Sequence, residues 1–309
     1  MKPAVFLGLP LGKAFEQKLA PRYTILTDPA RKGEAEALVT IGAVEMGAEF
    51  FDTMPKLKLL CCFGSGYEGV DIETATTRGI KVANTVGANA ATVADFAIAL
   101  LLASVRQVVA SDRLTRAGKW RGDNPAPLLF LRGLTGRKVG IVGLGAIGMK
   151  IAKRLEGFET EIAYHGRSEK PGVPYRYFPD VLSLATWADT LILAHRADET
   201  NRHMVNAEVL AALGAKGHVI NISRGSAIDE DALIAALKNG IIAGAGLDVF
   251  ENEPEPRTDL ITLPNVVVTP HIGGGSSEAI EAMGDAVIAN LNAFFDGKPL
   301  PNPVTAPST

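Results

Sequence analysis

The sequence is poor in cysteine, with only two among 309 residues, and these two are neighbours. Cys61 and Cys62 lie in an apolar run that ends at Phe63. Adjacent residues of an extended strand point to opposite faces, so the two thiols are poor disulfide partners. This excludes a disulfide-stabilised secreted scaffold. It favours two small core residues in a reducing compartment, with a redox role as the alternative.

Long apolar runs are also missing. The longest, residues 96–105, ends at Arg106 and is shorter than the about 20 residues that a membrane-spanning helix needs. Pro10 and Gly12 interrupt the apolar N-terminus, which therefore predicts a first strand rather than a signal peptide. We expect a cytoplasmic protein that has no membrane partner.

An excess of one charge is absent as well. The 31 basic and 34 acidic residues give a net charge of −3, which argues against a broad basic surface and so against a nucleic-acid partner. No metal site is expected. A content of 47% hydrophobic and 21% charged residues is that of a globular protein, and the length suits two domains.

Short apolar runs alternate with helical patterns along the whole chain, which predicts parallel sheets covered by helices, the α/β class. In the first part we expect strands near residues 5–9, 35–39, 57–63 and 82–83. In the second part we expect six strands, at residues 139–142, 161–164, 190–194, 218–221, 243–247 and 266–269. Helices are expected between them, for example at residues 148–156 and 230–239, and a last helix at residues 276–295 returns to the first part.

Two stretches lie between these parts. Residues 90–110 have the pattern of one long apolar helix, which suits a connector between domains. Residues 118–132 break the pattern, yet they hold Trp120 and Phe130 beside prolines and leucines. A loop this apolar is expected to pack against something, either another subunit or its own domain.

A glycine motif opens the second part, where the strand at residues 139–142 runs into the sequence GLGAIG and then a helix. In this context the spacing predicts a dinucleotide site, with a purely structural turn as the alternative. Gly143 permits the tight turn, Gly145 lets the backbone approach a pyrophosphate, and Gly148 lets the helix pack on the strand. The helix N-terminus offers free N–H groups and a positive dipole end to the phosphates.

The motif and the six strands together predict a doubly wound dinucleotide-binding domain, and the first part predicts a flavodoxin-like one. We therefore expect two Rossmann-like domains with a cleft between them. Residues 1–97 with 284–309 would form a discontinuous substrate-binding domain, and residues 98–283 would form the dinucleotide-binding domain.

The end of the second strand of this domain indicates the type of dinucleotide. NAD sites usually carry an acidic residue there, but this strand is followed by Arg167 and Ser168. Arg167 can pair with a 2′-phosphate, and Ser168 can donate a hydrogen bond to it. This favours NADP(H), with NAD(H) still possible. The alternative is an arginine on a solvated loop.

Three further segments follow expected strands, at the edge where open α/β sheets bind ligands. They are residues 219–225 (VINISRG), 245–254 (AGLDVFENEP) and 266–274 (VVVTPHIGG). Together with residues 64–71 (GSGYEGVD) and 90–95 (AATVAD), they resemble the D-isomer-specific 2-hydroxyacid dehydrogenase family, especially its glyoxylate/hydroxypyruvate reductase branch. The resemblance extends over essentially the whole chain.

The resemblance implies an NAD(P)H-dependent reductase of small 2-keto acids with three catalytic residues. His271 would donate the proton as hydride arrives, since an imidazole titrates near neutral pH. Glu253 would orient the imidazole and favour its charged form. Arg224 would bind the substrate carboxylate and polarise the 2-carbonyl.

The same resemblance implies the remaining contacts and a homodimer. The backbone of Gly64, Ser65 and Gly66 would join Arg224 in holding the substrate carboxylate. Asp248 resembles the residue that bonds the nicotinamide carboxamide. The residues expected to contact the cofactor are Thr92, Gly143, Gly145, Ala146, Ile147, Gly148, Arg167, Ser168, His195, Ile222, Asp248 and Gly273.

Some positions depart from the family's usual pattern. Val86 stands where many relatives have proline, and Glu68 with Gly69 replaces a more usual Asp-Asn type pair. His195 and Arg196 stand where relatives often have an apolar or proline-containing segment. The expected substrates are glyoxylate and hydroxypyruvate. Hydroxyphenylpyruvate, phosphite or a non-catalytic corepressor-like role are the alternatives.

Overall fold

The computed structural model describes residues 2–120 and 131–305. The chain divides into two compact units: unit 1 comprises Met1–Asn89 and Gly275–Thr309, and unit 2 comprises Ala90–Gly274. The boundaries expected after residues 97 and 283 would fall inside helices α4 (Ala90–Val105) and α11 (Ser277–Phe295). A continuous helix packs as one piece, so the units divide just before each helix instead.

Unit 1 is built on a six-stranded sheet with the order β13-β5-β4-β3-β1-β2. Strands β1 to β5 are parallel and follow the flavodoxin-like order 2-1-3-4-5. Strand β13 pairs antiparallel with β5. The strands are β1 (Ala4–Leu7), β2 (Thr24–Leu26), β3 (Ala37–Thr40), β4 (Leu59–Cys62), β5 (Lys81–Ala83) and β13 (Pro303–Val304).

Helices cover both faces of this sheet. Helix α1 (Lys13–Leu19) shares a core with α11, and α2 (Ala48–Asp52) shares another with α3 (Ile72–Thr77). Cys61 belongs to the first core and Cys62 to the second, so the two side chains lie on opposite faces, as expected. Both are free thiols, and burial raises the pKa of Cys61 and brings that of Cys62 to about 12. Buried, protonated thiols are inert, which favours the structural interpretation over a redox role.

Unit 2 is built on a seven-stranded, wholly parallel sheet with the order β12-β11-β10-β9-β6-β7-β8. This is the doubly wound order, with its switch point between β6 and β9. The strands are β6 (Lys138–Val142), β7 (Glu161–His165), β8 (Arg176–Phe178), β9 (Thr190–Leu193), β10 (His218–Asn221), β11 (Gly244–Leu247) and β12 (Val266–Val268). The expected fold class is confirmed.

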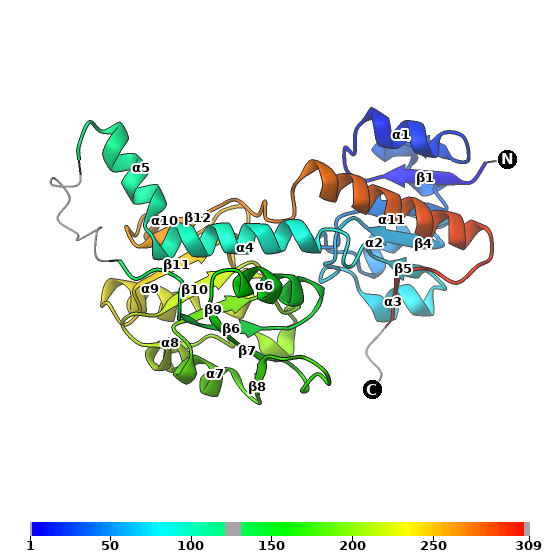
Figure 1. Cartoon of the computed structure of the whole chain (residues 1–309). Coiled ribbons are helices and arrows are strands. Elements are labelled where there is room, and N and C mark those ends of the chain that lie inside the picture. The colour runs from blue at the N-terminus through cyan, green and yellow to red at the C-terminus, as the bar shows by residue number, and fades with distance from the viewer. Residues whose placement is uncertain (1, 121–130, 306–309) are drawn as a thin grey trace. The chain divides into compact units, whose positions relative to one another are not determined.

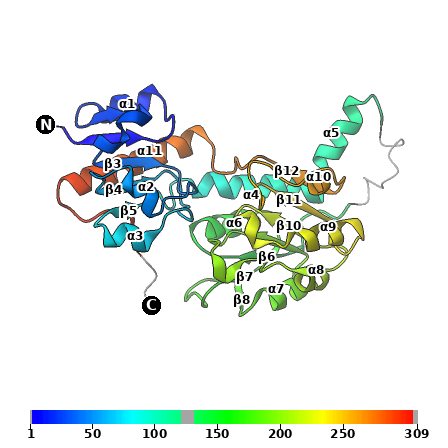
Figure 2. The same ribbon diagram turned by 180° about the vertical axis from the view of Figure 1, so that it is seen from behind.

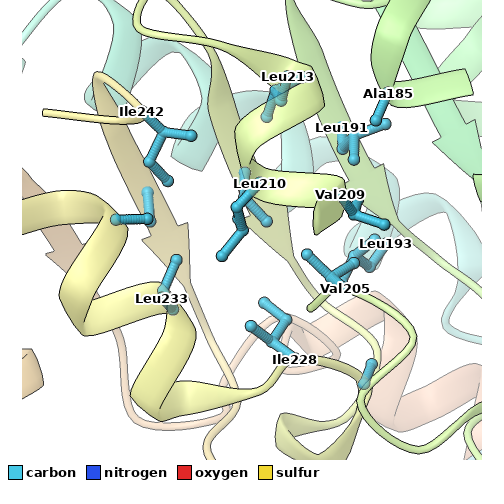
Figure 3. Close-up of a cluster of buried hydrophobic side chains, with 14 of the residues drawn as sticks. Ala185, Leu191, Leu193, Val205, Val209, Leu210, Leu213, Ile228, Leu233 and Ile242 are labelled. Atoms are coloured by element: carbon cyan, nitrogen blue, oxygen red, sulfur yellow. The ribbon is translucent and has the colours of Figure 1, made fainter. Parts of the chain in front are cut away.

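One face of the unit 2 sheet is covered by α4 and α6 (Ala146–Glu156), and the other by α7 (Val181–Trp187), α8 (Ala207–Leu213) and α9 (Glu230–Lys238) (Figures 1 and 2). The short α10 (Thr258–Ile261) precedes β12. Figure 3 shows the core beneath α7 to α9, where Leu210 and Leu233 pack with Leu191 and Leu193 of β9. The central strands β9, β10 and β11 are buried along their whole length, as expected for parallel strands with helices on both faces of the sheet.

The single helix expected at residues 90–110 is wrong. Helix α4 ends at Val105, and α5 (Val108–Arg116) leaves at an angle of 62°. Gln107 adopts a left-handed conformation with φ 49°, which terminates a helix. The apolar character also ends here, because α4 has many buried residues and α5 has none.

Three strands were missed by the sequence interpretation, namely β2, β8 and β13. Each has only two or three residues and forms the edge of its sheet. Such short edge strands carry too few residues for a clear periodic pattern. In its described residues, the second unit therefore has a sheet of seven strands where six were expected.

The apolar stretch at residues 118–132 is described only at its ends, and Phe130 lies outside the described residues. Trp120 is 67% exposed.

Among the described helices, none is by itself long and apolar enough to cross a membrane. The bent pair α4 and α5 meets these criteria only when the two are counted together.

Candidate active site

The glycine turn after β6 has the geometry that a dinucleotide site requires. Gly143 has φ 93°, and a Cβ there would lie 2.5 Å from the Cα of His195. A Cβ on Gly148 would lie 2.1 Å from the Gly143 carbonyl oxygen, so the helix packs directly on the turn. Gly145 has nothing within 4 Å of its Cβ position, which leaves room for a ligand. The three glycines thus do three different things.

Helix α6 begins at Ala146, directly after Gly145, and no side chain caps its N-terminus. The first N–H groups of a helix have no intrahelical partner, so those of Ala146 and Ile147 are available to an anion. The open space at Gly145 lies at this same helix end. These features fit the pyrophosphate of a dinucleotide.

The loop after β7 lies next to this turn, because the Gly143 N–H donates to the His165 carbonyl at 2.8 Å. Arg167 and Ser168 are both exposed there. The loop is held in place by tyrosine hydroxyls: Tyr164 Oη accepts from the Lys170 N–H at 2.7 Å, and Tyr177 Oη donates to the Gly166 carbonyl at 3.3 Å. An exposed arginine on a fixed loop beside the pyrophosphate site fits a 2′-phosphate.

His195 follows β9 on the other side of the turn. Its backbone packs against Gly143, and Ser223 Oγ donates to its carbonyl at 2.6 Å. Both ring nitrogens are buried without a hydrogen-bond partner among the described residues. Burial, with a smaller effect of His165, lowers the pKa of His195 to about 4, so the ring is neutral at physiological pH. Buried nitrogens without partners next to the turn fit a polar group of the cofactor.

Arg224, Glu253 and His271 come from the loops after β10, β11 and β12, and the structure brings the last two into contact. His271 Nδ1 lies 2.6 Å from Glu253 Oε2, and Glu253 Oε1 accepts the Phe250 N–H at 2.9 Å. Burial alone would raise the pKa of Glu253. The hydrogen bonds from His271 and Phe250, with the charges of His271 and Arg224, lower it overall. Glu253 is therefore a carboxylate at neutral pH, suited to orienting an imidazole.

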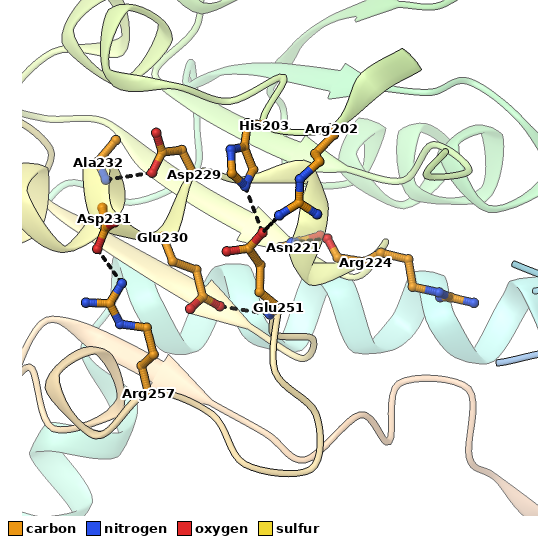
Figure 4. A network of polar contacts seen from close by, with 10 residues as sticks. All are labelled: Arg202, His203, Asn221, Arg224, Asp229, Glu230, Asp231, Ala232, Glu251 and Arg257. Carbon is orange, nitrogen blue, oxygen red and sulfur yellow. Dashed lines mark hydrogen bonds and ion pairs between the residues drawn. The ribbon is translucent and has the colours of Figure 1, made fainter. Parts of the chain in front are cut away.

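Arg224 begins a short 3-10 turn, Gly225–Ala227, and its Nη1 donates to the Ser223 carbonyl at 2.7 Å. Figure 4 shows its side chain extended away from the neighbouring cluster of charged residues. Its charge contributes to the lowered pKa of Glu253, which places the two groups within electrostatic reach of each other. A cation beside an imidazole–carboxylate pair suits a substrate that carries a carboxylate next to a carbonyl.

Asp248 holds the loop that carries His271. The carboxylate is buried, and it accepts hydrogen bonds from Thr269 Oγ1 at 2.6 Å, the Ile272 N–H at 3.0 Å and the Gly273 N–H at 2.7 Å. The His271 N–H donates to the Asp248 carbonyl at 2.8 Å, and His271 has φ 54°. The sequence interpretation assigned Asp248 to the cofactor and missed this structural role. This role was missed because Asp248 and its partners, Thr269 to Gly273, lie more than 20 residues apart in the chain.

The first turns of α4 lie against the same site. Arg154 Nε of α6 donates to Asp95 at 2.6 Å, which ties α4 to the helix after the glycine turn. A Cβ on Gly273 would lie 3.2 Å from the Phe96 ring. Ile222 is buried in the core that α4 shares with the sheet. Thr92, on the first turn of α4, is thus carried by an element that contacts both the glycine helix and the His271 loop.

The glycine turn at residues 64–66 lies in unit 1. Gly64 has φ 122°, its N–H donates to Thr85 Oγ1 at 2.9 Å, and its carbonyl accepts the Thr85 N–H at 2.9 Å. Asn84 Nδ2 donates to the Ser65 carbonyl at 2.9 Å. The segment Asn84–Thr85 therefore holds this turn in a fixed shape.

Within residues 2–120 and 131–305, no group of three or more His, Cys, Asp or Glu residues could hold a metal ion.

Comparisons with known proteins agree with this geometry. The profile of a family described as "D-isomer specific 2-hydroxyacid dehydrogenase, NAD binding domain" matches residues 98–273. Hydroxyphenylpyruvate reductase of Plectranthus scutellarioides is 40% identical over 97% of this chain and 98% of its own length. Glyoxylate/hydroxypyruvate reductase A of Arabidopsis thaliana is 40% identical with the same coverage.

A solved structure is similar over the whole chain. The NADPH-dependent glyoxylate/hydroxypyruvate reductase of Sinorhizobium meliloti, in complex with NADP and malonate, has a TM-score of 0.90 and 38% identity. The match covers 98% of this chain and 97% of that one.

Proposed function

Because the chain belongs to the D-isomer-specific 2-hydroxyacid dehydrogenase family, we propose that it reduces a small 2-keto acid to the D-2-hydroxy acid with NADPH. The observation that carries this proposal is the 2.6 Å contact between His271 and Glu253, with the charge of Arg224 acting on it. All three residues follow strands of the sheet whose glycine turn fits a dinucleotide.

Each residue has a definite task in the reduction. The nicotinamide cofactor, when bound, supplies the hydride. Arg224 binds the carboxylate of the keto acid and stabilises the negative charge that develops on the 2-oxygen. His271 gives a proton to that oxygen, and Glu253 stabilises the imidazolium before the transfer. From the Gly64–Gly66 turn we propose that the N–H groups of Ser65 and Gly66 bind the carboxylate, because the Gly64 N–H donates to Thr85 Oγ1.

The proposed cofactor site uses the residues around the first glycine turn. The N-terminus of α6 holds the pyrophosphate, and Arg167 and Ser168 hold the 2′-phosphate of NADP. The other residues proposed to contact the cofactor are His195, Ile222, Asp248, Gly273 and Thr92. NADP(H) is the main cofactor, and NAD(H) remains usable.

Exchange of Arg167 for aspartate tests the cofactor proposal. Arg167→Asp should weaken NADPH binding by about tenfold or more, because a charge-assisted hydrogen bond is replaced by repulsion. Binding of NADH should be unchanged or improved. Arg116→Asp, which makes the same charge change on α5, serves as the control. Fluorescence titration measures both affinities, and equal NADPH affinity in wild type and Arg167→Asp would contradict the proposal.

The proposed substrates are glyoxylate and hydroxypyruvate, which yield glycolate and D-glycerate. A second candidate is hydroxyphenylpyruvate, because a reductase named for that acid is as similar as the glyoxylate/hydroxypyruvate enzyme. The ratio of kcat/KM values decides between them, since specificity is a ratio of these constants. An advantage of about tenfold or more for the aromatic acid would overturn the small-substrate proposal and leave the reaction class intact.

The same assay panel covers the remaining alternatives. Phosphite is included as a substrate, with each cofactor in turn. A protein that binds NADPH and turns over none of these compounds would be a binding module rather than an enzyme.

The proposed assembly is a homodimer. None of the residues of α5 is buried, and Val108 and Trp120 expose 53% and 67% of their surface. Exposed apolar side chains of this size favour burial against a partner. Light scattering at micromolar concentration tests this, and a monomer mass would contradict it. Cell fractionation with activity in the cytosol tests the proposed cytoplasmic location.

A further inference from the structure

A second group of charged side chains meets on the loop that carries Glu253. Glu251 Oε1 accepts a hydrogen bond from Arg202 Nη2 at 2.7 Å and lies 2.7 Å from His203 Nε2 (Figure 4). Only 21% of the Glu251 side chain is exposed, whereas Arg202 is half exposed. The sequence interpretation singled out none of the three. We call this group the Glu251 clamp.

The backbone beside the clamp is held on two more sides. Glu230 Oε1, at the start of α9, accepts the Glu251 N–H at 2.9 Å, and Glu253 Oε1 accepts the Phe250 N–H. A Cβ on Gly225 would lie 1.8 Å from the Phe250 carbonyl carbon. The residue after Arg224 therefore touches the Phe250–Glu251 peptide group, whose N–H donates to Glu230.

The other half of the clamp is anchored to the segment after Arg224. His203 has φ 52°, a left-handed conformation that is uncommon for residues other than glycine. Its N–H donates to the Ser226 carbonyl at 2.7 Å, and Val205 forms a bridge with Ile228. The clamp thus links the segment after Arg224 to the loop that carries Glu253.

We propose that Glu251, held by Arg202 and His203, is a positioning residue that keeps Glu253 aligned with His271 for proton transfer. This inference rests on the proposed function, because it concerns the proton donor of that reaction. Without the charge of Glu251, Arg202 and His203 lose their partner and the loop at residues 250–253 gains freedom. Glu253 then stabilises the charged imidazole less well.

Further charged groups surround Glu251. Arg202 and His203 contact its side chain, and Glu230 faces it from α9 with Arg257 and Asp231 near by. Burial raises the pKa of Glu230, with the repulsion of Glu251 and Asp231 adding to it and the Glu251 N–H and Arg257 opposing it.

Glu251→Gln tests the proposal with Glu255→Gln as the matched control, an exposed residue of the same loop. We expect kcat for glyoxylate reduction to fall by about tenfold, since small displacements of catalytic groups cost up to about 100-fold. KM and the NADPH dissociation constant should change by less than about twofold, so that the loss falls on kcat and not on binding. Glu251→Asp should recover part of the loss. Glu255→Gln should behave as wild type.

Hydrogen exchange separates this proposal from the proposed function. Amide exchange in a peptide covering residues 248–256 should be about tenfold faster in Glu251→Gln, and unchanged in Glu255→Gln, because freed N–H groups exchange faster. Arg202→Met should give the same pattern from the exposed side of the clamp, which keeps the test valid if Glu251→Gln folds poorly.

Unchanged kcat and unchanged exchange in both clamp variants would overturn the role of Glu251. So would a rise in KM at constant kcat. A wild-type protein that reduces no 2-keto acid would instead overturn the proposed function. In that case the exchange data would still show whether Glu251 holds the loop.

Discussion

The two units each place a glycine turn at the end of a parallel strand, and the two turns lead into different structures. After β6, Gly143 and Gly145 lead directly into the 11 residues of α6, whose N-terminus has no side-chain cap. After β4, Gly64–Gly66 leads into irregular chain, and the next helix, α3, has its N-terminus capped by Asp71, which accepts the Thr74 N–H at 2.9 Å. One turn offers a helix end, and the other offers only its own backbone.

This difference indicates what each turn can bind. A pyrophosphate is large and doubly charged, so it benefits from several N–H groups and the positive end of a helix dipole. A single carboxylate needs only a small nest of N–H groups. Similar sequence signals, glycines after a strand, are therefore consistent with the proposed nucleotide site in unit 2 and the proposed carboxylate site in unit 1.

The largest effect should come from removing the proposed proton donor, His271, which lies in unit 2. His271→Ala should lower kcat by about 10²–10⁴-fold, the usual contribution of a general acid. NADPH affinity, measured by fluorescence titration, should stay near that of wild type because the glycine turn is untouched. Near wild-type turnover would show that the chemistry lies elsewhere.

The second-largest effect is expected from a side chain added to the glycine turn of unit 2, which should weaken NADPH binding. Gly145→Val fills the open space beside the α6 N-terminus, so the NADPH dissociation constant should rise by about 100-fold through lost charge-assisted hydrogen bonds. Gly157→Ala is the control, at the other end of α6, where a Cβ would meet only an ordinary contact at 3.5 Å. If Gly145→Val binds NADPH as tightly as this control, the pyrophosphate does not lie at the turn.

A smaller effect is expected from a change in unit 1, and it should alter KM for the substrate instead of the affinity for the cofactor. Thr85→Val removes the hydroxyl that accepts the Gly64 N–H and keeps the shape of the side chain. KM for glyoxylate should rise by about three- to tenfold, the effect of losing one hydrogen bond, while NADPH affinity stays constant. Steady-state kinetics with titration of the cofactor checks both. A change in NADPH affinity without a change in KM would reverse the assignment of the two turns.

The units should also differ in their response to acid. All five histidines lie in unit 2, and burial lowers the pKa of His195 and His218 to about 4. The unfolded chain takes up these protons near pH 6.5 and the folded chain does not, so stability falls as pH drops from about 6.5 to about 4. The expected loss at pH 5 is about 2 kcal/mol for each of the two histidines.

Denaturant unfolding between pH 7 and pH 4.5 measures this loss. His218→Gln, which removes one of the two groups, should reduce the proton uptake on unfolding by about one proton. Hydrogen exchange at pH 5 should show the destabilisation in unit 2 peptides. An equal loss in unit 1, or the same pH slope in His218→Gln, would contradict the assignment.

The sequence predicted the longer strands of both sheets, because these carry clear apolar runs, but it missed the short edge strands β2, β8 and β13. The family resemblance implied Arg224, Glu253 and His271, and in the structure all three follow strands, with His271 in contact with Glu253. The spacing of Gly143, Gly145 and Gly148 was equally informative, since each glycine answers a local steric need. The break between α4 and α5 was missed because a left-handed glutamine has no strong sequence signature. The roles of Asp248 and Glu251 were missed because their partners lie far away in the chain and no periodicity links them.

The discontinuity of unit 1 has a consequence for how the chain matures during synthesis. Its core needs Val287 and Leu291 of α11, and its sheet needs β13 to cover the edge of β5. Unit 2 is continuous from Ala90 to Gly274, so every residue that it buries has been translated before α11. The segment that is translated first therefore completes its fold last. Until then β5 is an open edge, and a nascent chain that stalls before α11 presents that edge to chaperones or to other chains.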